Sequence, residues 1–250
     1  MASMQTKSQV SIVIAIVSVL LIGSIFFFMN AKEEQPSLAA DLQPVVSFVE
    51  TCLKDQAESG LLFLGSQGGF YERMRSENYL SLSIPYYLEG NATSVPSLEH
   101  IEQELNFYIQ DNLEYCIDNF ESMDWLGIAV QALEQPVVKS SVGEKDVTIN
   151  LEYPLKITQG TTTSEQRSFV ATVSLNFKHI HSIVGDVMDQ QKSEVLALHM
   201  GFLAKSAYDN DYFFELIQLD EQTVIFSFKF ENEKLRNEPY YYNFAQRYDW

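Results

Sequence analysis

Hydrophobic residues follow three patterns along the chain, and the first is an unbroken apolar run near its beginning. No charged residue stands between Val10 and Met29, where the sequence reads VSIVIAIVSVLLIGSIFFFM. Twenty helical residues span about 30 Å, which is the thickness of the hydrocarbon core of a bilayer. The run therefore predicts a transmembrane helix with the lipid bilayer as its partner.

The residues around this run indicate its orientation. Lys7 is the only charged residue before it, and Lys32, Glu33 and Glu34 follow it. A cation on the amino-terminal side favours a cytoplasmic N-terminus and an extracellular remainder. A cleaved secretory signal is the alternative, but its apolar region is usually about 7 to 15 residues long. We expect residues 1–30 to be an uncleaved, single-pass anchor in the cell membrane.

The second pattern repeats apolar residues at steps of three and four, which is typical of amphipathic helices. It predicts one helix from Pro44 to about Gly65 and another after Pro96, with Ser97 as its N-cap. Residues 31–44 form a stalk before them, because proline interrupts a helix. The apolar positions are Val45, Val46, Val49, Cys52, Leu53, Ala57, Leu61 and Leu64, then Leu98, Ile101, Leu105, Tyr108, Ile109, Leu113, Cys116, Ile117 and Phe120.

The two cysteines of the chain fall one on each of these apolar stripes. In an oxidising compartment, thiols that meet across a helix pair form a disulfide, so we predict a bond between Cys52 and Cys116. The alternative is that both are free thiols, buried as small apolar residues. On the chain-entropy model, a bond that closes a loop of this length stabilises the fold by about 4 kcal/mol.

The third pattern alternates apolar and polar residues, which predicts half-buried strands. The segments are residues 147–157 and 169–177, then 212–219 and 224–230, and last 240–244. The first two pairs are separated by turn-forming residues and therefore predict antiparallel hairpins. Pro154 indicates an edge or a bulge, because proline cannot donate a ladder hydrogen bond.

Together the patterns predict an α+β fold class. We expect an N-terminal transmembrane helix, then an ectodomain with two disulfide-linked helices, antiparallel β hairpins and one further helix. The further helix falls at residues 180–188, where helical spacing returns. The ectodomain covers residues 45–250, either as one domain or as a helical part, 45–123, beside a β-rich part, 124–250.

The charge of the chain restricts its partners. It carries 16 Lys and Arg against 34 Asp and Glu, a formal net charge of -18. Affinity for nucleic acid depends mainly on neutralising phosphates with Lys and Arg. The composition therefore excludes nucleic acid as a partner.

Candidate catalytic and metal-binding residues are few. His179 and His181 are two positions apart, so on a helix they point in different directions, and no further zinc ligand stands at a suitable spacing. The glycine-rich segment 65–69 lacks the Lys and the Ser or Thr of a phosphate-binding loop. Asp209 and Asp211 lack the remaining positions of a calcium loop. We expect no catalytic residues, no cofactor and no metal site.

One surface modification is expected. Asn91-Ala92-Thr93 is the only N-x-Ser/Thr sequence, and it stands between Gly90 and Pro96 in what should be an exposed loop. In a lineage that glycosylates its exported proteins, Asn91 would carry a glycan.

The order Lys7-Ser8-Gln9-Val10 stands directly ahead of the apolar run. It resembles the class III signal of archaeal pilin-like proteins. The resemblance implies processing between Ser8 and Gln9, with the apolar helix retained. Many pilins carry a glutamate five residues into the mature helix, and this chain departs from that pattern with Val13.

Five segments after the stalk carry a second resemblance. They are residues 49–53 (VETCL), 65–69 (GSQGG), 84–87 (IPYY), 112–116 (NLEYC) and 238–240 (EPY). They resemble a family of uncharacterised, membrane-anchored extracytoplasmic proteins from small-genome archaea. The family implies an extracytoplasmic location and a pilin-like N-terminus, and it supplies neither an enzymatic activity nor catalytic residues.

An anchor, a disulfide and the absence of a recognisable reaction centre predict a non-enzymatic cell-surface protein. Its acidic ectodomain would mediate envelope or cell–cell interactions, by contact with envelope proteins or by self-association. A pilin-like subunit of a surface filament is one alternative. An extracytoplasmic ligand receptor or enzyme with an unrecognised site is another.

Overall fold

The first described element is a long helix, α2 (Gln43–Ser66), in a computed structural model that describes residues 42–72, 76–193, 195 and 197–248. Pro44 lies in its first turn, where a missing backbone N–H is tolerated. The helix ends one residue beyond the predicted Gly65. Gly68 and Gly69 then take positive φ angles, and the Gly69 N–H donates to the Leu64 carbonyl at 2.7 Å, which closes the helix.

The second helix, α3 (Leu98–Ile117), has the predicted N-cap and runs antiparallel to α2. The Ser97 hydroxyl accepts a hydrogen bond from the backbone N–H of His100 at 3.2 Å. Gly60 of α2 permits a close approach of the two helices, because a Cβ there would lie 2.7 Å from a methyl carbon of Leu105. The apolar stripe of α2 is buried, and that of α3 is buried except at Leu98, Tyr108 and Cys116, which are partly buried.

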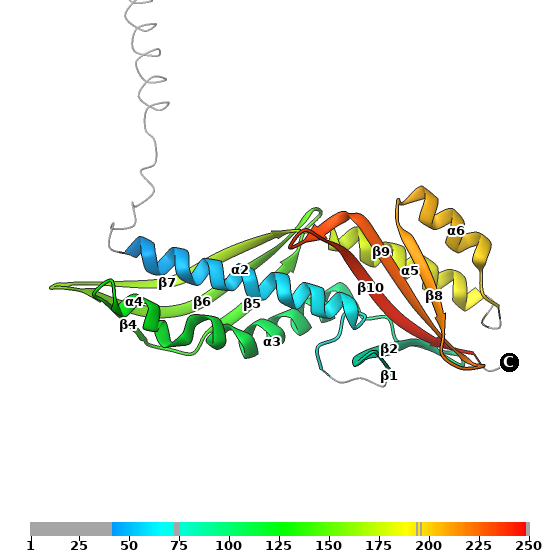
Figure 1. The fold of residues 1–250 in the computed structure, drawn as a ribbon, viewed down its shortest axis with the longest axis horizontal. Coiled ribbons are helices and arrows are strands. Elements are labelled where there is room, and N and C mark those ends of the chain that lie inside the picture. The colour runs from blue at the N-terminus through cyan, green and yellow to red at the C-terminus, as the bar shows by residue number, and fades with distance from the viewer. Residues whose placement is uncertain (1–41, 73–75, 194, 196, 249–250) are drawn as a thin grey trace, which may run out of the picture. The chain divides into compact units, whose positions relative to one another are not determined.

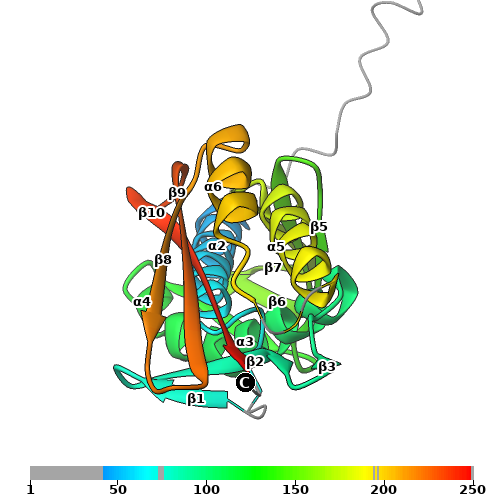
Figure 2. The same ribbon diagram turned by 90° about the vertical axis from the view of Figure 1, so that its right-hand side faces the viewer.

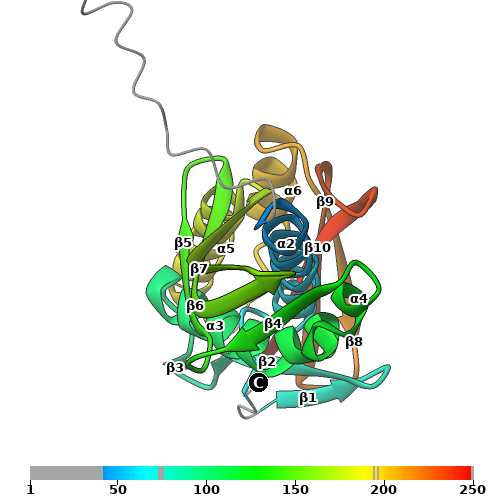
Figure 3. The same ribbon diagram turned by 90° about the vertical axis from the view of Figure 1, so that its left-hand side faces the viewer.

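Four antiparallel strands form the smaller sheet, which packs against both helices. They are β4 (Ile128–Ala132), β5 (Val137–Val142), β6 (Asp146–Gln159) and β7 (Thr162–Ser174). The hairpin predicted from alternation is β6 with β7, and its pairing shifts between Glu152 and Leu155, which confirms a bulge around Pro154. Figure 3 shows β4 beside the short helix α4 (Glu121–Asp124).

Six strands form the larger sheet. They are β1 (Ser76–Tyr79), β2 (Leu82–Glu89), β3 (Ala92–Thr93), β8 (Phe213–Gln218), β9 (Thr223–Leu235) and β10 (Glu238–Arg247). The predicted hairpin β8–β9 and the last strand β10 are confirmed. One pairing was not predicted: β10 lies parallel to β2, with Ala245 opposite Tyr86. The early part of the chain therefore shares a sheet with its end.

Two helices cover the inner face of this larger sheet. They are α5 (Phe177–Ser193), which contains the predicted further helix, and α6 (Met200–Asp209). Figure 2 shows them side by side next to β8, β9 and β10. The Phe177 ring meets the rings of Tyr240 and Tyr242 at 6.2 and 6.1 Å, which joins α5 to β10.

Buried tyrosines join the larger sheet to the end of α2, which passes from β6 and β7 to β10 (Figure 1). The Tyr240 hydroxyl donates to the Leu61 carbonyl at 2.8 Å. The Tyr87 hydroxyl lies 2.7 Å from the Gly68 carbonyl and 2.7 Å from the Tyr242 hydroxyl. These bonds satisfy polar groups that would otherwise be buried without a partner.

The α+β class is confirmed, but the predicted architecture is wrong in three respects. No helix among the described residues is long and apolar enough to cross a membrane. The segment from Val10 to Met29 and the stalk up to residue 41 lie outside the described residues. A second later helix, α6, is present, and the larger sheet contains a parallel pair beside its hairpins.

Candidate binding site

A pocket of about 440 Å³ opens between the C-terminal half of α3 and the smaller sheet. We call it the α3 pocket. Its main lining side chains are Gln110, Leu113, Glu114 and Ile117 of α3, with Phe120 and, from β6, Tyr153. Residues of β4 and the following loop complete the wall. Small-molecule sites commonly have about 300 to 1,000 Å³ and an apolar lining with a few polar groups.

One wall of the α3 pocket is a backbone segment in an unusual conformation. Asp118, Asn119 and Phe120 have φ angles of 45°, 50° and 63°, so three consecutive residues are left-handed. Asp and Asn tolerate this region, but Phe rarely adopts it. The conformation places the Phe120 ring 6.3 Å from the rings of Phe48 and Tyr153. Local strain of this kind costs about 1 to 3 kcal/mol and is concentrated at functional sites.

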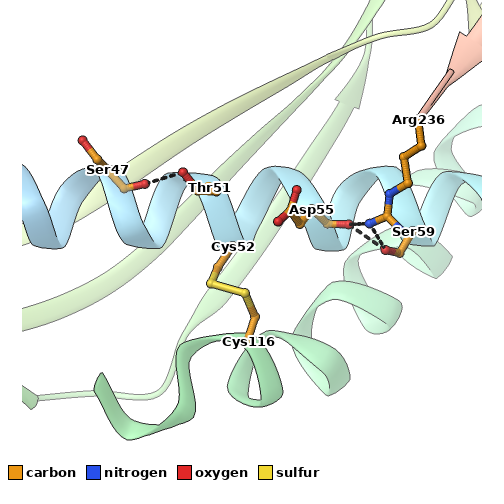
Figure 4. Close-up of a disulfide and its surroundings, with 7 residues drawn as sticks. All are labelled: Ser47, Thr51, Cys52, Asp55, Ser59, Cys116 and Arg236. Atoms are coloured by element: carbon orange, nitrogen blue, oxygen red, sulfur yellow. Dashed lines mark hydrogen bonds between the residues drawn. A yellow bond between two sulfur atoms is a disulfide. The ribbon is translucent and has the colours of Figure 1, made fainter. Parts of the chain in front are cut away.

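A disulfide fixes the same end of α3. Cys52 and Cys116 are bonded, with Cα atoms 5.7 Å apart, so the predicted pairing is confirmed and the alternative of two free thiols is wrong. Figure 4 shows the bond joining the middle of α2 to the last turn of α3. Since the strained segment begins two residues after Cys116, the bond anchors the wall of the α3 pocket to α2.

The neighbouring turns of α2 are held by a side chain from the larger sheet. Arg236, in the β9–β10 turn, donates to the Asp55 carbonyl at 2.8 Å and to the Ser59 hydroxyl at 2.6 Å (Figure 4). Its guanidinium also lies 3.7 Å from the Glu58 carboxylate. The helix is thus bound covalently on one side and by charge-assisted hydrogen bonds on another.

One exposed carboxylate, that of Glu114, lies in the lining of the α3 pocket. Glu114 is the only charged side chain in its lining, and no described residue forms an ion pair with it. Burial, and then the nearby Glu114 carboxylate, raise the pKa of Tyr153, so its hydroxyl stays protonated at neutral pH. Two rings, Phe120 and Tyr153, stand beside this carboxylate in the lining.

Apolar side chains are exposed close to this pocket. Tyr115, Leu133 and Val137 each follow a lining residue in the chain, and all three are solvent-exposed. Exposed aromatic and aliphatic side chains around a concave site are typical of protein-binding surfaces. The described lining contains no Ser, Cys, His or Lys, so it offers no serine, thiol or amine nucleophile and no histidine base. The arrangement can bind a cation that carries an apolar stem.

The other residues that the sequence analysis considers do not come together in one site. Asn91 is exposed in the turn between β2 and β3, while Ser8 and Gln9 lie outside the described residues. His181 places its Nε2 atom 2.7 Å from the Pro96 carbonyl, and His179 is exposed. Among the residues that the structure describes, no group of three or more His, Cys, Asp or Glu could hold a metal.

Sequence reasoning missed the residues of the α3 pocket. Glu114 falls on the polar side of an amphipathic helix, where a carboxylate is typical of the solvent-exposed surface. Tyr153 falls on an apolar position of a strand, which predicts a core residue. The only local signal was Asp118-Asn119 after α3, because these two residue types favour left-handed turns.

Comparisons with known proteins identify no relative of this chain. A scan against protein-family models found no family that matches the chain, and neither a search of curated proteins nor a search of solved structures found a match. The resemblance to membrane-anchored archaeal surface proteins, the pilin-like processing and the non-enzymatic character stay predictions.

Proposed function

We propose that this chain is a non-enzymatic, extracytoplasmic binding protein whose α3 pocket binds a basic side chain of another envelope protein. The observation that carries the proposal is the Glu114 carboxylate, which lines the pocket without a cationic partner among the described residues. A Lys or Arg from a partner would supply the missing charge. Its aliphatic stem would cover the apolar lining, as long basic side chains do elsewhere.

The aromatic rings of the pocket support a cationic ligand. Phe120 and Tyr153 are stacked, with 6.3 Å between ring centroids and an interplanar angle of 25°. A guanidinium or ammonium group is attracted to the face of such a ring, by about 0.5 to 2 kcal/mol. The net charge of -18 adds a long-range attraction for basic partners, which raises the rate of encounter.

The disulfide supports the proposed location. Such bonds persist in oxidising compartments and are rare in the cytosol, where thiols are kept reduced. In intact native cells treated with a membrane-permeable alkylating reagent, Cys52 and Cys116 should remain unmodified until a reductant is added. Alkylation of both residues without reductant would contradict an extracytoplasmic location.

Binding to the pocket can be tested with capped pentapeptides that differ only in a central Lys, Arg, Gln or Glu. The full chain should bind the Lys and Arg peptides about tenfold more tightly than the Gln peptide in calorimetric titrations. Glu114→Gln keeps the shape of the side chain and removes its charge, so it should abolish this preference.

The matched control is Glu121→Gln, which removes one exposed carboxylate from α4, outside the lining. This variant should keep the preference for basic peptides within about twofold, because Glu121 does not line the pocket and its charge acts on the peptide only through screened solvent. Equal affinity for the Lys and Gln peptides, tighter binding of the Glu peptide, or equal effects of the two substitutions would each reject the proposal.

A further inference from the structure

A second cavity, of about 620 Å³, lies between the end of α2 and the β1–β2 hairpin. We call it the hairpin cavity. Among the described residues, its lining consists of two aromatic residues, two amides, three serines and one leucine. These described side chains carry no charge, and they offer hydrogen bonds and aromatic surface to a ligand.

The aromatic side of the hairpin cavity is rigid. Phe63 and Tyr71 belong to a cluster with Tyr108 in which all three ring centroids lie 5.3 to 5.7 Å apart. The Tyr71 hydroxyl donates to Asp111 at 2.9 Å, and the Tyr71 backbone N–H donates to the Glu104 carboxylate at 2.6 Å. Because Glu104 is only 3% exposed, this second bond is fixed within the protein.

The polar side of the cavity has unused hydrogen-bonding capacity. Gln67 accepts one bond through its Oε1 atom from the backbone N–H of Ser83 at 3.3 Å, which leaves its amide NH₂ group unused among the described residues. Asn78 and Ser81 are exposed, and their side chains bond to no other described residue. Two planar amides and a hydroxyl can each donate and accept hydrogen bonds.

The edge of the cavity is formed by a strained turn. Leu80 and Ser81 join β1 to β2 with φ angles of 48° and 69°, the conformation that favours Asn-Gly. Leu80 is also 79% exposed at the tip of this turn. Leu80 therefore gains little from burial and adopts a backbone conformation that is unfavourable for leucine, and such departures are concentrated at binding sites.

A smaller chamber adjoins the hairpin cavity. Its volume is about 20 Å³, enough for one water molecule. The two spaces share Gln67, Tyr71, Ser76 and Ser83 in their linings. The Ser76 and Ser83 hydroxyls are 2.5 Å apart and form a hydrogen bond with each other. Each can form a further hydrogen bond with a ligand hydroxyl or with water.

We infer that the hairpin cavity binds a neutral carbohydrate. A sugar ring presents an apolar C–H face that packs on an aromatic ring, and hydroxyls that both donate and accept hydrogen bonds to amides and serines. Among the described lining residues, a charged ligand would find no side chain of opposite charge to offset the hydration that it loses. The site is separate from the α3 pocket, so the two binding activities can fail independently.

The test uses the full chain in a detergent that has no sugar headgroup. Neutral methyl glycosides of hexoses and of N-acetylhexosamines are titrated at up to about 50 mM, with methyl glucuronide as the anionic comparison. We expect at least one neutral glycoside to give saturable NMR chemical-shift changes at residues that line the cavity. The same sugar at the end of an oligosaccharide should bind equally or more tightly if the natural source is a glycan, and more weakly if it is a free sugar.

Two variants connect that binding to the cavity. Asn78→Ala should weaken it by about tenfold, since one amide contributes both a donor and an acceptor. Asn150→Ala, which removes an exposed amide from β6, should leave it within about twofold. Tyr71→Phe keeps the ring and should preserve most of the affinity, whereas Tyr71→Leu should remove it.

Three results would overturn the inference. The first is the absence of saturable binding by every neutral glycoside in the panel. The second is tighter binding of the glucuronide than of its neutral counterpart. The third is binding that Asn78→Ala and Tyr71→Leu leave unchanged while both variants retain the melting temperature of the parent chain.

Discussion

The two halves of α2 are held to the rest of the fold by different kinds of interaction. The first half is joined to α3 by the Cys52–Cys116 bond and packs on aliphatic side chains. The second half meets the larger sheet through fully buried tyrosines, whose hydroxyls bond to backbone carbonyls such as that of Leu61. A covalent bond stabilises the half of α2 beside the α3 pocket, and buried rings with paired hydroxyls join the other half to the larger sheet.

This difference has a physical reason. Side chains that line a pocket have no protein atoms on one side, so they make fewer dispersion contacts and are less buried. In the α3 pocket, the left-handed run from Asp118 to Phe120 adds backbone strain. A disulfide offsets such losses by restricting the unfolded chain rather than by filling space. The tyrosine region needs no crosslink, because its rings fill the interior and its hydroxyls are paired.

The largest expected effect is a loss of stability at high pH that comes from the buried tyrosines at the second half of α2. Burial raises the pKa of Tyr87, Tyr240 and Tyr242 well above the usual value near 10. The unfolded chain loses these three protons first, so the free energy of unfolding falls as the pH rises above about 10, by about 4 kcal/mol per pH unit. Below that pH the three residues contribute no pH dependence.

Tyrosinate absorbance and circular dichroism, followed together, check this effect. Tyr87, Tyr240 and Tyr242 should ionise only as the fold is lost, because burial raises the pKa of each hydroxyl. Complete ionisation with an unchanged circular dichroism spectrum would mean that the buried hydroxyls are open to water.

Removing the crosslink should have the next largest effect. Cys52→Ala combined with Cys116→Ala should lower the free energy of unfolding by about 4 kcal/mol, because the bond closes a loop with a sequence separation of 64 residues. Urea denaturation measures this change. A reductant should destabilise the parent chain similarly and leave the double variant unaffected. A loss below about 1 kcal/mol would show that packing alone holds the helix pair.

A glycine substitution tests how closely α2 meets the larger sheet. A Cβ on Gly65 would lie 2.4 Å from the Tyr241 carbonyl oxygen, and backbone cannot move aside cheaply. Gly65→Ala should therefore cost about 2 kcal/mol in thermal or urea denaturation.

Gly185→Ala is the control for this substitution. Gly185 lies within α5 and has nothing within 4 Å of the new methyl group, so alanine there should stabilise the chain by up to about 1 kcal/mol. If the two alanine variants had the same stability, the close contact between α2 and β10 would be disproved.

The smallest expected effect concerns one pair of hydroxyls. Tyr87→Phe should cost about 1 to 2 kcal/mol, because it removes the bonds of its hydroxyl to the Gly68 carbonyl and to the Tyr242 hydroxyl. Tyr242→Phe should cost less, because the Tyr87 hydroxyl still donates to the Gly68 carbonyl. The double variant should lose less than the sum of the two, with a coupling of about 1 kcal/mol in a double-mutant cycle. Strict additivity would mean that the two hydroxyls do not bond to each other.

Local features were predictable because their signals lie within a few residues. Ser97 caps α3, and the β6–β7 hairpin has its bulge at Pro154, as the residue types require. The parallel pairing of β2 with β10 was missed, because Ile84-Pro85-Tyr86-Tyr87 is a continuous apolar run without alternation. Buried on both faces, such a strand has no period of two to detect.

The sequence by itself determined both amphipathic helices, the hairpins and the cysteine pair, because periodicity and turn chemistry act locally. Only the tertiary structure decided that Glu114 and Tyr153 line one pocket, and that three tyrosine hydroxyls meet the end of α2. Those contacts join segments far apart in the chain. They depend on how all the buried side chains pack together, which no local pattern specifies.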